Sequence, residues 1–267
     1  MQTNVTIQLL AGKSLIFMAV VVSALSFTQP AFAQNATAAD DSIAPKQTSL
    51  FCAKVDSSVI ALDQLLSESE TKYSEATITR KQTLAETRTE SDKSLADARI
   101  KADESYSEQY KILMAAAVTK TEKKAVTSFQ KTVTQAITDR REAVDAAIKT
   151  YRAGVDKVMS TRESKYSAAI TTLKATIDSA YASAKADCAA DGTATASGSA
   201  VNPQVKNDLA MQNARTQFAN TIAALEKDTA KIETLTSARD TAVGDADALF
   251  QTIVQAAGGK LKIALNQ

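Results

Sequence analysis

FQKTVTQAITD RREAVDAAIKT YRAGVDKVMST (129–161) is the stretch that decides the fold of this chain. It consists of three segments of eleven residues, and the same period continues to residue 183 and recurs over 69–112. Eleven residues make almost three turns of α-helix, so each position of the repeat forms a column along one helix face. The fifth position is large and apolar in every segment of the later set: Val133, Val144, Val155, Tyr166 and Ile177. The repeat therefore predicts long helices over 49–190.

Helix-breaking residues are almost absent from this stretch. Between Pro45 and Gly192 there is no proline and a single glycine, Gly154. Such a sequence has few places where a helix must end, so it is compatible with two arrangements. One is a single continuous helix of about 140 residues, and the other is an antiparallel hairpin with a reversal near residues 115–122.

Three features favour the hairpin. Cys52 and Cys188 lie symmetrically about residue 120. Thr119 and Glu122 have the spacing of a capping box, which begins a helix. The eleven-residue pattern also lapses over 113–123. Folding the chain there sets Tyr73 level with Tyr166, and it brings the apolar columns of the two arms together.

A third helix is expected because the apolar columns of the hairpin are narrow, and helical stability in proteins comes mainly from packing. A small-residue linker over 191–202 precedes Asn202-Pro203, an N-cap residue followed by proline at the first helical position. The helix is expected over 203–258, to end at Gly258-Gly259, and to leave a short tail over 259–267. The predicted fold is all-α: an elongated antiparallel helical hairpin with a third long helix, in a coiled-coil-like bundle.

The N-terminus has the features of a secretory signal peptide. Lys13 precedes an apolar run over 15–25, and an A-x-A pattern ends at Ala33. We expect a signal peptide over 1–33, cleaved after Ala33, and then a flexible leader over 34–48. An uncleaved anchor is the alternative, although the apolar run is shorter than a membrane span. The protein is expected to be secreted, periplasmic or at the cell surface, without strong membrane binding after cleavage.

The two cysteines are the only candidate site residues. In an exported chain Cys52 and Cys188 are most simply read as a disulfide that holds the open ends of the hairpin together. Two free thiols or bridges between chains are the alternatives.

Catalysis is not expected. The sequence analysis therefore predicts no catalytic, cofactor-binding or metal-ligating residues. The sequence has no histidine, the usual general base and the commonest metal ligand. Its charges are balanced, with 31 Lys and Arg against 30 Asp and Glu, so there is no basic surface for nucleic acid. Four acidic residues recur every eleven positions and are interpreted as a solvated helix face: Glu75, Glu86, Asp97 and Glu108.

The predicted function is that of an exported, non-enzymatic helical rod. It serves as a structural, spacer or protein-interaction module, and its partner is another protein or a second copy of the chain through helical faces. Two alternatives stay open. One is binding to lipid or to a membrane surface, since exchangeable apolipoproteins and desiccation-related helical proteins also use eleven-residue repeats. The other is a holdase-like chaperone with helical arms.

Overall fold

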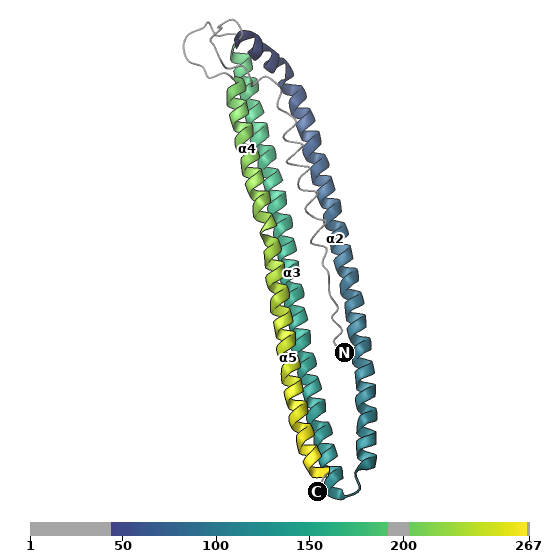
Figure 1. Ribbon diagram of the computed structural model, residues 1–267. Coiled ribbons are helices and arrows are strands. Elements are labelled where there is room, and N and C mark those ends of the chain that lie inside the picture. The colour runs from purple at the N-terminus through teal and green to yellow at the C-terminus, as the bar shows by residue number, and fades with distance from the viewer. Residues whose placement is uncertain (1–43, 192–202, 266–267) are drawn as a thin grey trace. The chain divides into compact units, whose positions relative to one another are not determined.

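The computed structural model describes residues 44–191 and 203–265, and nearly all of these are helical. The described residues form four helices: α2 (Ala44–Ala116), α3 (Lys120–Asp191), α4 (Pro203–Glu226) and α5 (Asp228–Leu265) (Figure 1). No strand occurs within these ranges. The expected signal peptide (1–33), most of the expected leader and nearly all of the expected linker lie outside the described residues.

Threonine is a poor helix former, but in these helices the hydroxyl groups of many threonines bond to the backbone. Thr89 Oγ1, for example, donates to the carbonyl of Ala85, one turn earlier, at 3.0 Å. The same bond recurs along α3, where Thr132 donates to Ser128, and along α5, where Thr252 donates to Ala248. Because the hydroxyl is satisfied within its own helix, threonine does not interrupt it.

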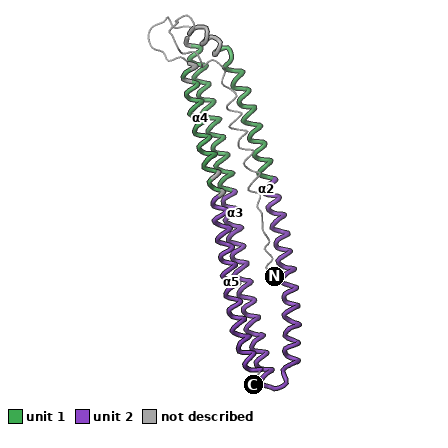
Figure 2. Tube along the Cα trace, in the orientation of Figure 1, with its two compact units in different colours: residues 1–78, 160–229 green, residues 79–159, 230–267 purple. Residues whose placement is uncertain are grey.

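The chain divides into two compact units (Figure 2). Unit 1 comprises Met1–Ile78 and Ser160–Thr229, and unit 2 comprises Thr79–Met159 and Ala230–Gln267. Each unit contains one segment of α2 and one segment of α3. The third helix of unit 1 is α4, and the third helix of unit 2 is nearly all of α5.

Unit 1 has one apolar core to which all three of its helices contribute. α2 supplies Leu62 and Leu66, and α4 supplies Phe218 among others. Tyr166 of α3 stacks on Tyr73 of α2, with ring centroids 3.6 Å apart, and meets Phe218 edge-on at 6.5 Å. Pairing of Tyr73 with Tyr166 is the register expected for antiparallel arms. Each buried aromatic or aliphatic side chain contributes about 1.5–3 kcal/mol.

Unit 2 has its apolar clusters near the reversal between α2 and α3. One cluster centres on Tyr110, Val133 and Ala257, and the next on Ala117, Val126 and Leu261. Farther from the reversal, within unit 2, the side chains of α2 are half-buried or exposed. From Thr79 to Gln109 none of its side chains is buried.

α5 is joined to α3 by contacts of arginine with aromatic rings. The guanidinium of Arg239 lies 4.7 Å from the ring centroid of Tyr151, and that of Arg140 lies 5.6 Å from the ring centroid of Phe250. Arg140 also bonds to Asp247 at 2.5 Å. From the sequence, Arg239 interrupts the apolar pattern of this helix. In the structure its side chain is only 16% exposed because the planar cation covers Tyr151.

The single helix expected over 203–258 is wrong, because the chain has two helices there. α4 ends at Glu226, Lys227 forms a turn, and α5 begins at Asp228. The Asp228 side chain is 4% exposed and lies 3.4 Å from Lys165 Nζ. Aspartate is favoured at a helix N-terminus, where its charge meets the positive end of the helix dipole. The first residue of α5 is therefore a buried aspartate whose charge is matched by Lys165 of α3.

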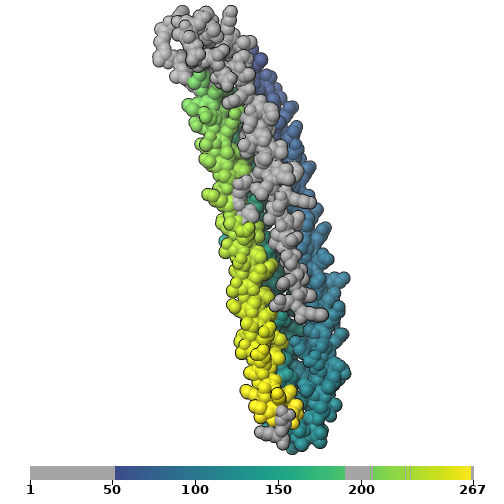
Figure 3. Space-filling view, viewed as in Figure 1, coloured from purple at the N-terminus to yellow at the C-terminus, as the bar shows by residue number. Residues whose placement is uncertain are grey.

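The helix end expected at Gly258-Gly259 is also wrong, and so is the short tail over 259–267, because α5 continues to Leu265. Two glycines inside a helix cost about 2 kcal/mol relative to alanine. Leu261, only 8% exposed, packs against Ala117 and Val126, and burying it contributes about 1.5–3 kcal/mol. In the space-filling view the end of α5 (yellow) lies against the residues around the reversal (teal) (Figure 3).

The leader expected over 34–48 ends earlier than expected, because α2 begins at Ala44. Pro45 is then in the first turn of the helix. A missing N–H is tolerated there, since that N–H has no acceptor within the helix.

Candidate functional site

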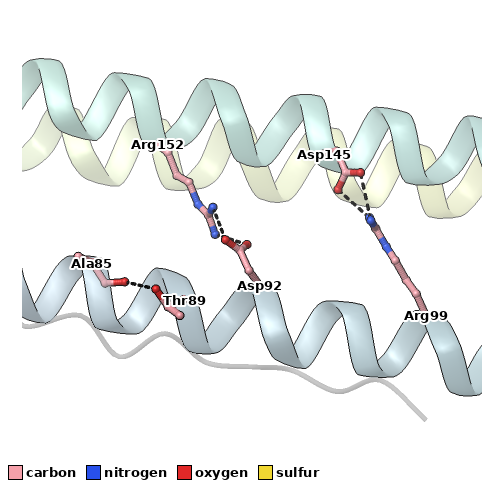
Figure 4. Close-up of polar contacts among 6 residues, drawn as sticks. All are labelled: Ala85, Thr89, Asp92, Arg99, Asp145 and Arg152. Atoms are coloured by element: carbon pink, nitrogen blue, oxygen red, sulfur yellow. Dashed lines mark hydrogen bonds and ion pairs between the residues drawn. The ribbon is translucent and has the colours of Figure 1, made fainter.

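A ladder of four arginine–aspartate pairs joins α2 to α3 within unit 2. In every pair both terminal nitrogens of the guanidinium donate to the two oxygens of one carboxylate, as Figure 4 shows for two of the pairs. The shortest N–O distances are 2.9 Å for Arg88–Asp156, 2.6 Å for Arg152–Asp92, 2.7 Å for Arg99–Asp145 and 2.5 Å for Arg141–Asp103. We call these eight residues the Arg–Asp ladder.

The ladder arises from one motif, R-x-x-x-D, that occurs twice in each helix. It spans 88–92 and 99–103 in α2, and 141–145 and 152–156 in α3. The two copies in each helix are eleven residues apart, so they lie on the same face. Because the helices are antiparallel here, each arginine of one meets an aspartate of the other. The residue numbers of every pair add up to 244.

The ladder residues are charged and partly open to solvent. The hydrogen bond from Arg152 holds the pKa of the Asp92 carboxyl below its usual value, and Arg141 does the same for Asp103. Asp92 in turn raises the pKa of Arg152. The ladder arginine side chains are 24–27% exposed and the aspartates 53–56%. At such exposure a single pair contributes at most about 1 kcal/mol, and two-pronged geometry and repetition favour the upper end.

Two ladder arginines also bind the backbone of the opposite helix. Arg88 donates to the carbonyl of Arg152 at 3.3 Å, and Arg141 donates to the carbonyl of Arg99 at 3.5 Å. These bonds hold the arginine stems across the helix pair. The ladder therefore sets the register of α2 on α3 where α2 has no buried side chain.

Glu122 and Thr119 close the reversal at the end of unit 2. The Glu122 carboxylate accepts hydrogen bonds from the backbone N–H groups of Val118 and Thr119, both at 2.7 Å. Thr119 Oγ1 accepts from the N–H of Glu122 at 3.1 Å. This is a reciprocal capping box, in which side chains satisfy backbone donors that have no helical partner. The two donors lower the pKa of Glu122.

The predicted site residues Cys52 and Cys188 lie in unit 1. They are at disulfide distance, with Cα atoms 5.8 Å apart, and they join α2 to α3. Two ion pairs between the same helices lie nearby in the sequence: Asp56–Lys185 at 2.8 Å and Glu70–Lys174 at 2.9 Å.

A shallow groove of about 300 Å³ runs between α3 and α4 in unit 1. Most of its lining is small, with Ala168, Thr172 and Ala214 among the residues, and Phe218 also lines it. Lys165 is the only titratable side chain that lines it. Its amine lies 3.4 Å from the carboxylate of Asp228, at the start of α5.

The remaining features are the acidic row, potential metal ligands and apolar helices. The acidic row Glu75, Glu86, Asp97 and Glu108 is exposed throughout. No cluster of three or more potential metal ligands occurs among the residues that the structure places. None of the described helices is long and apolar enough to cross a membrane.

The sequence interpretation missed the ladder, although a signal for it exists. R-x-x-x-D occurs at 88, 99, 141 and 152, with the same eleven-residue spacing in both arms. Reversal of one arm places every arginine opposite an aspartate. That complementarity becomes visible only when charges are compared between the arms, whereas the interpretation compared only the apolar columns of the two arms.

The chain matches no family model, no curated protein and no solved structure.

Proposed function

We propose that this chain is an exported, non-enzymatic helical rod that acts as a spacer or protein-interaction module. The observation that carries the proposal is the Arg–Asp ladder. Its eight charged groups bind one another and two backbone carbonyls, so they hold two long helices in one register. Charged groups that are paired between two helices in this way align the helices with each other.

The eleven-residue repeat supports the same function. It places the ladder on one face of each helix, and the other positions of the repeat form faces whose residues recur at a constant spacing. An elongated, coiled-coil-like arrangement presents such faces to a partner. The signal-like residues 1–33 support a location outside the cytoplasm.

Small-angle X-ray scattering of residues 34–267 tests the proposal. A rod is expected to have a maximum dimension of about 110 Å, the length of the 73-residue helix α2 at 1.5 Å per residue. A much shorter, compact particle would contradict it. Liposome flotation provides a second test, because the lipid-binding alternative requires the chain to float with vesicles and the spacer does not.

A matched pair of variants tests the role of the ladder. Arg88, Arg99, Arg141 and Arg152 are all changed to glutamine in the first variant. Four exposed lysines of the same helices are changed to glutamine in the control: Lys93, Lys101, Lys124 and Lys131. Both variants lose four positive charges. Only the first variant is expected to broaden the distribution of interatomic distances obtained from the scattering. Equal distributions for the two variants would argue against the ladder as the element that aligns the helices.

A further inference from the structure

The reversal between α2 and α3 is a three-residue hinge, Ala117–Thr119. Val118 at its centre is 82% exposed, whereas Ala117 is buried against Val126 and Leu261. The hinge conformation depends on the capping box, since the N–H groups of Val118 and Thr119 both donate to Glu122.

The hinge sequence is also compatible with a continuous helix. Residues 113–118 read LMAAAV, without glycine or proline, and alanine and leucine are strong helix formers. In a continuous helix the N–H groups of Val118 and Thr119 bond to carbonyls one turn earlier instead of to Glu122. The N–H of Ala117 already makes such a bond, to Leu113 at 3.2 Å. The bent and the straight hinge therefore satisfy the same backbone donors.

The contacts that hold α2 on α3 in unit 2 do not depend on the two helices belonging to one chain. The ladder and the cluster of Tyr110 with Val133 join antiparallel segments that are connected through the hinge and through the Cys52–Cys188 link. When α3 is exchanged, that link forms between the two chains. If the hinge straightens, α2 of one chain and α3 of a second chain can form the same pairs. Short hinge loops are a common site of such exchange.

We propose that a second copy of this chain is a partner of the helical module, and that it binds by exchange of α3 through straightening of Ala117–Thr119. The ladder selects this partner. Along each helix the ladder residues follow the order Arg, Asp, Arg, Asp, with spacings of four, seven and four residues. Read from the other end of the helix, the order is Asp, Arg, Asp, Arg with the same spacings, so an antiparallel helix with this motif places an opposite charge at all four positions. If one helix is shifted by one turn, Arg88 faces Arg152 instead. The result is a two-fold symmetric dimer with two complete ladders.

The inference rests on the proposed interaction function and names its partner. Within one chain the two ladder halves are held close together, so the hairpin predominates in dilute solution. Exchange between chains is favoured over the hairpin when the chain folds at high concentration or when the capping box of Thr119 and Glu122 is removed.

Complementation between two charge-inverted full-length chains tests the proposal. The first chain has the α2 half inverted: Arg88→Asp, Asp92→Arg, Arg99→Asp and Asp103→Arg. The second has the α3 half inverted: Arg141→Asp, Asp145→Arg, Arg152→Asp and Asp156→Arg. Neither chain can form a matched ladder alone or with its own copies by exchange. An exchanged heterodimer forms two matched ladders.

The two chains carry different tags and are unfolded, reduced, mixed and refolded with oxidation. Light scattering after gel filtration and tandem pull-down measure the heterodimer. We expect at least tenfold more heterodimer than either homodimer. Products identical to those of the separately refolded chains overturn the proposal.

Lys120→Pro in both chains is the hinge control. Proline fits the first position of α3, but it breaks a continuous helix. We expect Lys120→Pro to abolish the heterodimer, and a heterodimer that persists shows side-by-side association and overturns exchange.

The wild-type chain provides a readout that does not depend on folding of the inverted chains. Its dimer fraction after refolding is expected to rise with concentration, to rise further in Thr119→Ala/Glu122→Ala, and to fall at least tenfold in Lys120→Pro. A dimer fraction that is equal in these three chains overturns the proposal. Scattering from the monomer fraction tests the spacer function separately, so the two proposals can fail independently.

Discussion

At the residue scale, one carboxylate governs the reversal of the chain. Glu122 accepts two backbone hydrogen bonds that neutral side chains form less well, since bonds to a charged acceptor are about twice as strong. Its pKa lies below the ordinary value of 4.5 in the folded chain. The charged form is therefore stabilised by folding, and its contribution is complete above the ordinary pKa. The contribution is lost as the pH falls through the folded pKa.

We predict that Glu122→Gln lowers the urea midpoint at pH 7, and that the difference from wild type shrinks as the pH falls below 4.5. Urea unfolding followed by circular dichroism across this range measures it. Glu86→Gln, which removes the same charge from an exposed site on α2, is the control and is expected to change the midpoint little. A difference for Glu122→Gln that stays constant with pH would contradict the cap.

The ladder makes a second prediction at this scale. Arg152→Gln is expected to lower the free energy of unfolding by about 0.5–1 kcal/mol, because it removes the paired bond to Asp92. The loss should largely disappear in about 1 M NaCl, where the screening length is about 3 Å. Lys111→Gln removes an exposed pair within α2, with Glu108, and should change the free energy less. A salt-independent loss would indicate that the arginine stem, and not its charge, stabilises the pair.

At the scale of the element, the end of α5 is stabilised by contacts with the reversal. Leu261 packs against Ala117 and Val126, whereas Ile263, two residues later, is 64% exposed. Gly258 and Gly259 have open space around them and make no packing contribution. The last turns of α5 therefore depend on one buried leucine and its neighbours.

We predict that Leu261→Ala lowers the free energy of unfolding by about 2–3 kcal/mol, the cost of emptying a buried leucine site. Ile263→Ala should change it by less than about 0.5 kcal/mol. Chemical denaturation measures both variants, and hydrogen exchange of residues 258–265 should rise only in the first. Equal effects of the two would place the end of α5 outside the packed cluster.

At the scale of the whole molecule, the two units hold α2 by different means. In unit 1 α2 contributes Leu62 and Leu66 to a three-helix core and carries Cys52. In unit 2 its stretch 79–109 has no buried side chain and is held by the ladder. Removing the covalent link and removing the charges should therefore affect different parts of the chain.

We predict that Cys52→Ala/Cys188→Ala destabilises unit 1 most. The two cysteines are 136 residues apart, and a link of that span contributes up to about 4–5 kcal/mol through the entropy of the unfolded chain. Hydrogen exchange followed by mass spectrometry should show a rise at residues 52–66 and 177–188. Peptides around Tyr110 and Val133 should change less. A larger rise in those unit 2 peptides would contradict this assignment.

Much of the secondary structure could be predicted because it depends on local chemistry. The scarcity of glycine and proline predicts long helices. The pair Thr119 and Glu122 places a helix start beside the observed α3 boundary at Lys120. Propensities and caps act over a few residues, so they can be read from adjacent positions.

The sequence thus predicted that most of the described chain is helical, and it marked Cys52 and Cys188 as a pair. Only the folded structure shows that the helix from Pro203 ends at Glu226, next to the contact of Asp228 with Lys165 from another helix. It also decided that α5 passes through Gly258-Gly259, because burial of Leu261 offsets the local cost of two glycines. The ladder likewise exists only when two distant segments lie antiparallel. Local propensity is a property of neighbours along the chain, whereas burial and charge pairing depend on residues that folding brings together.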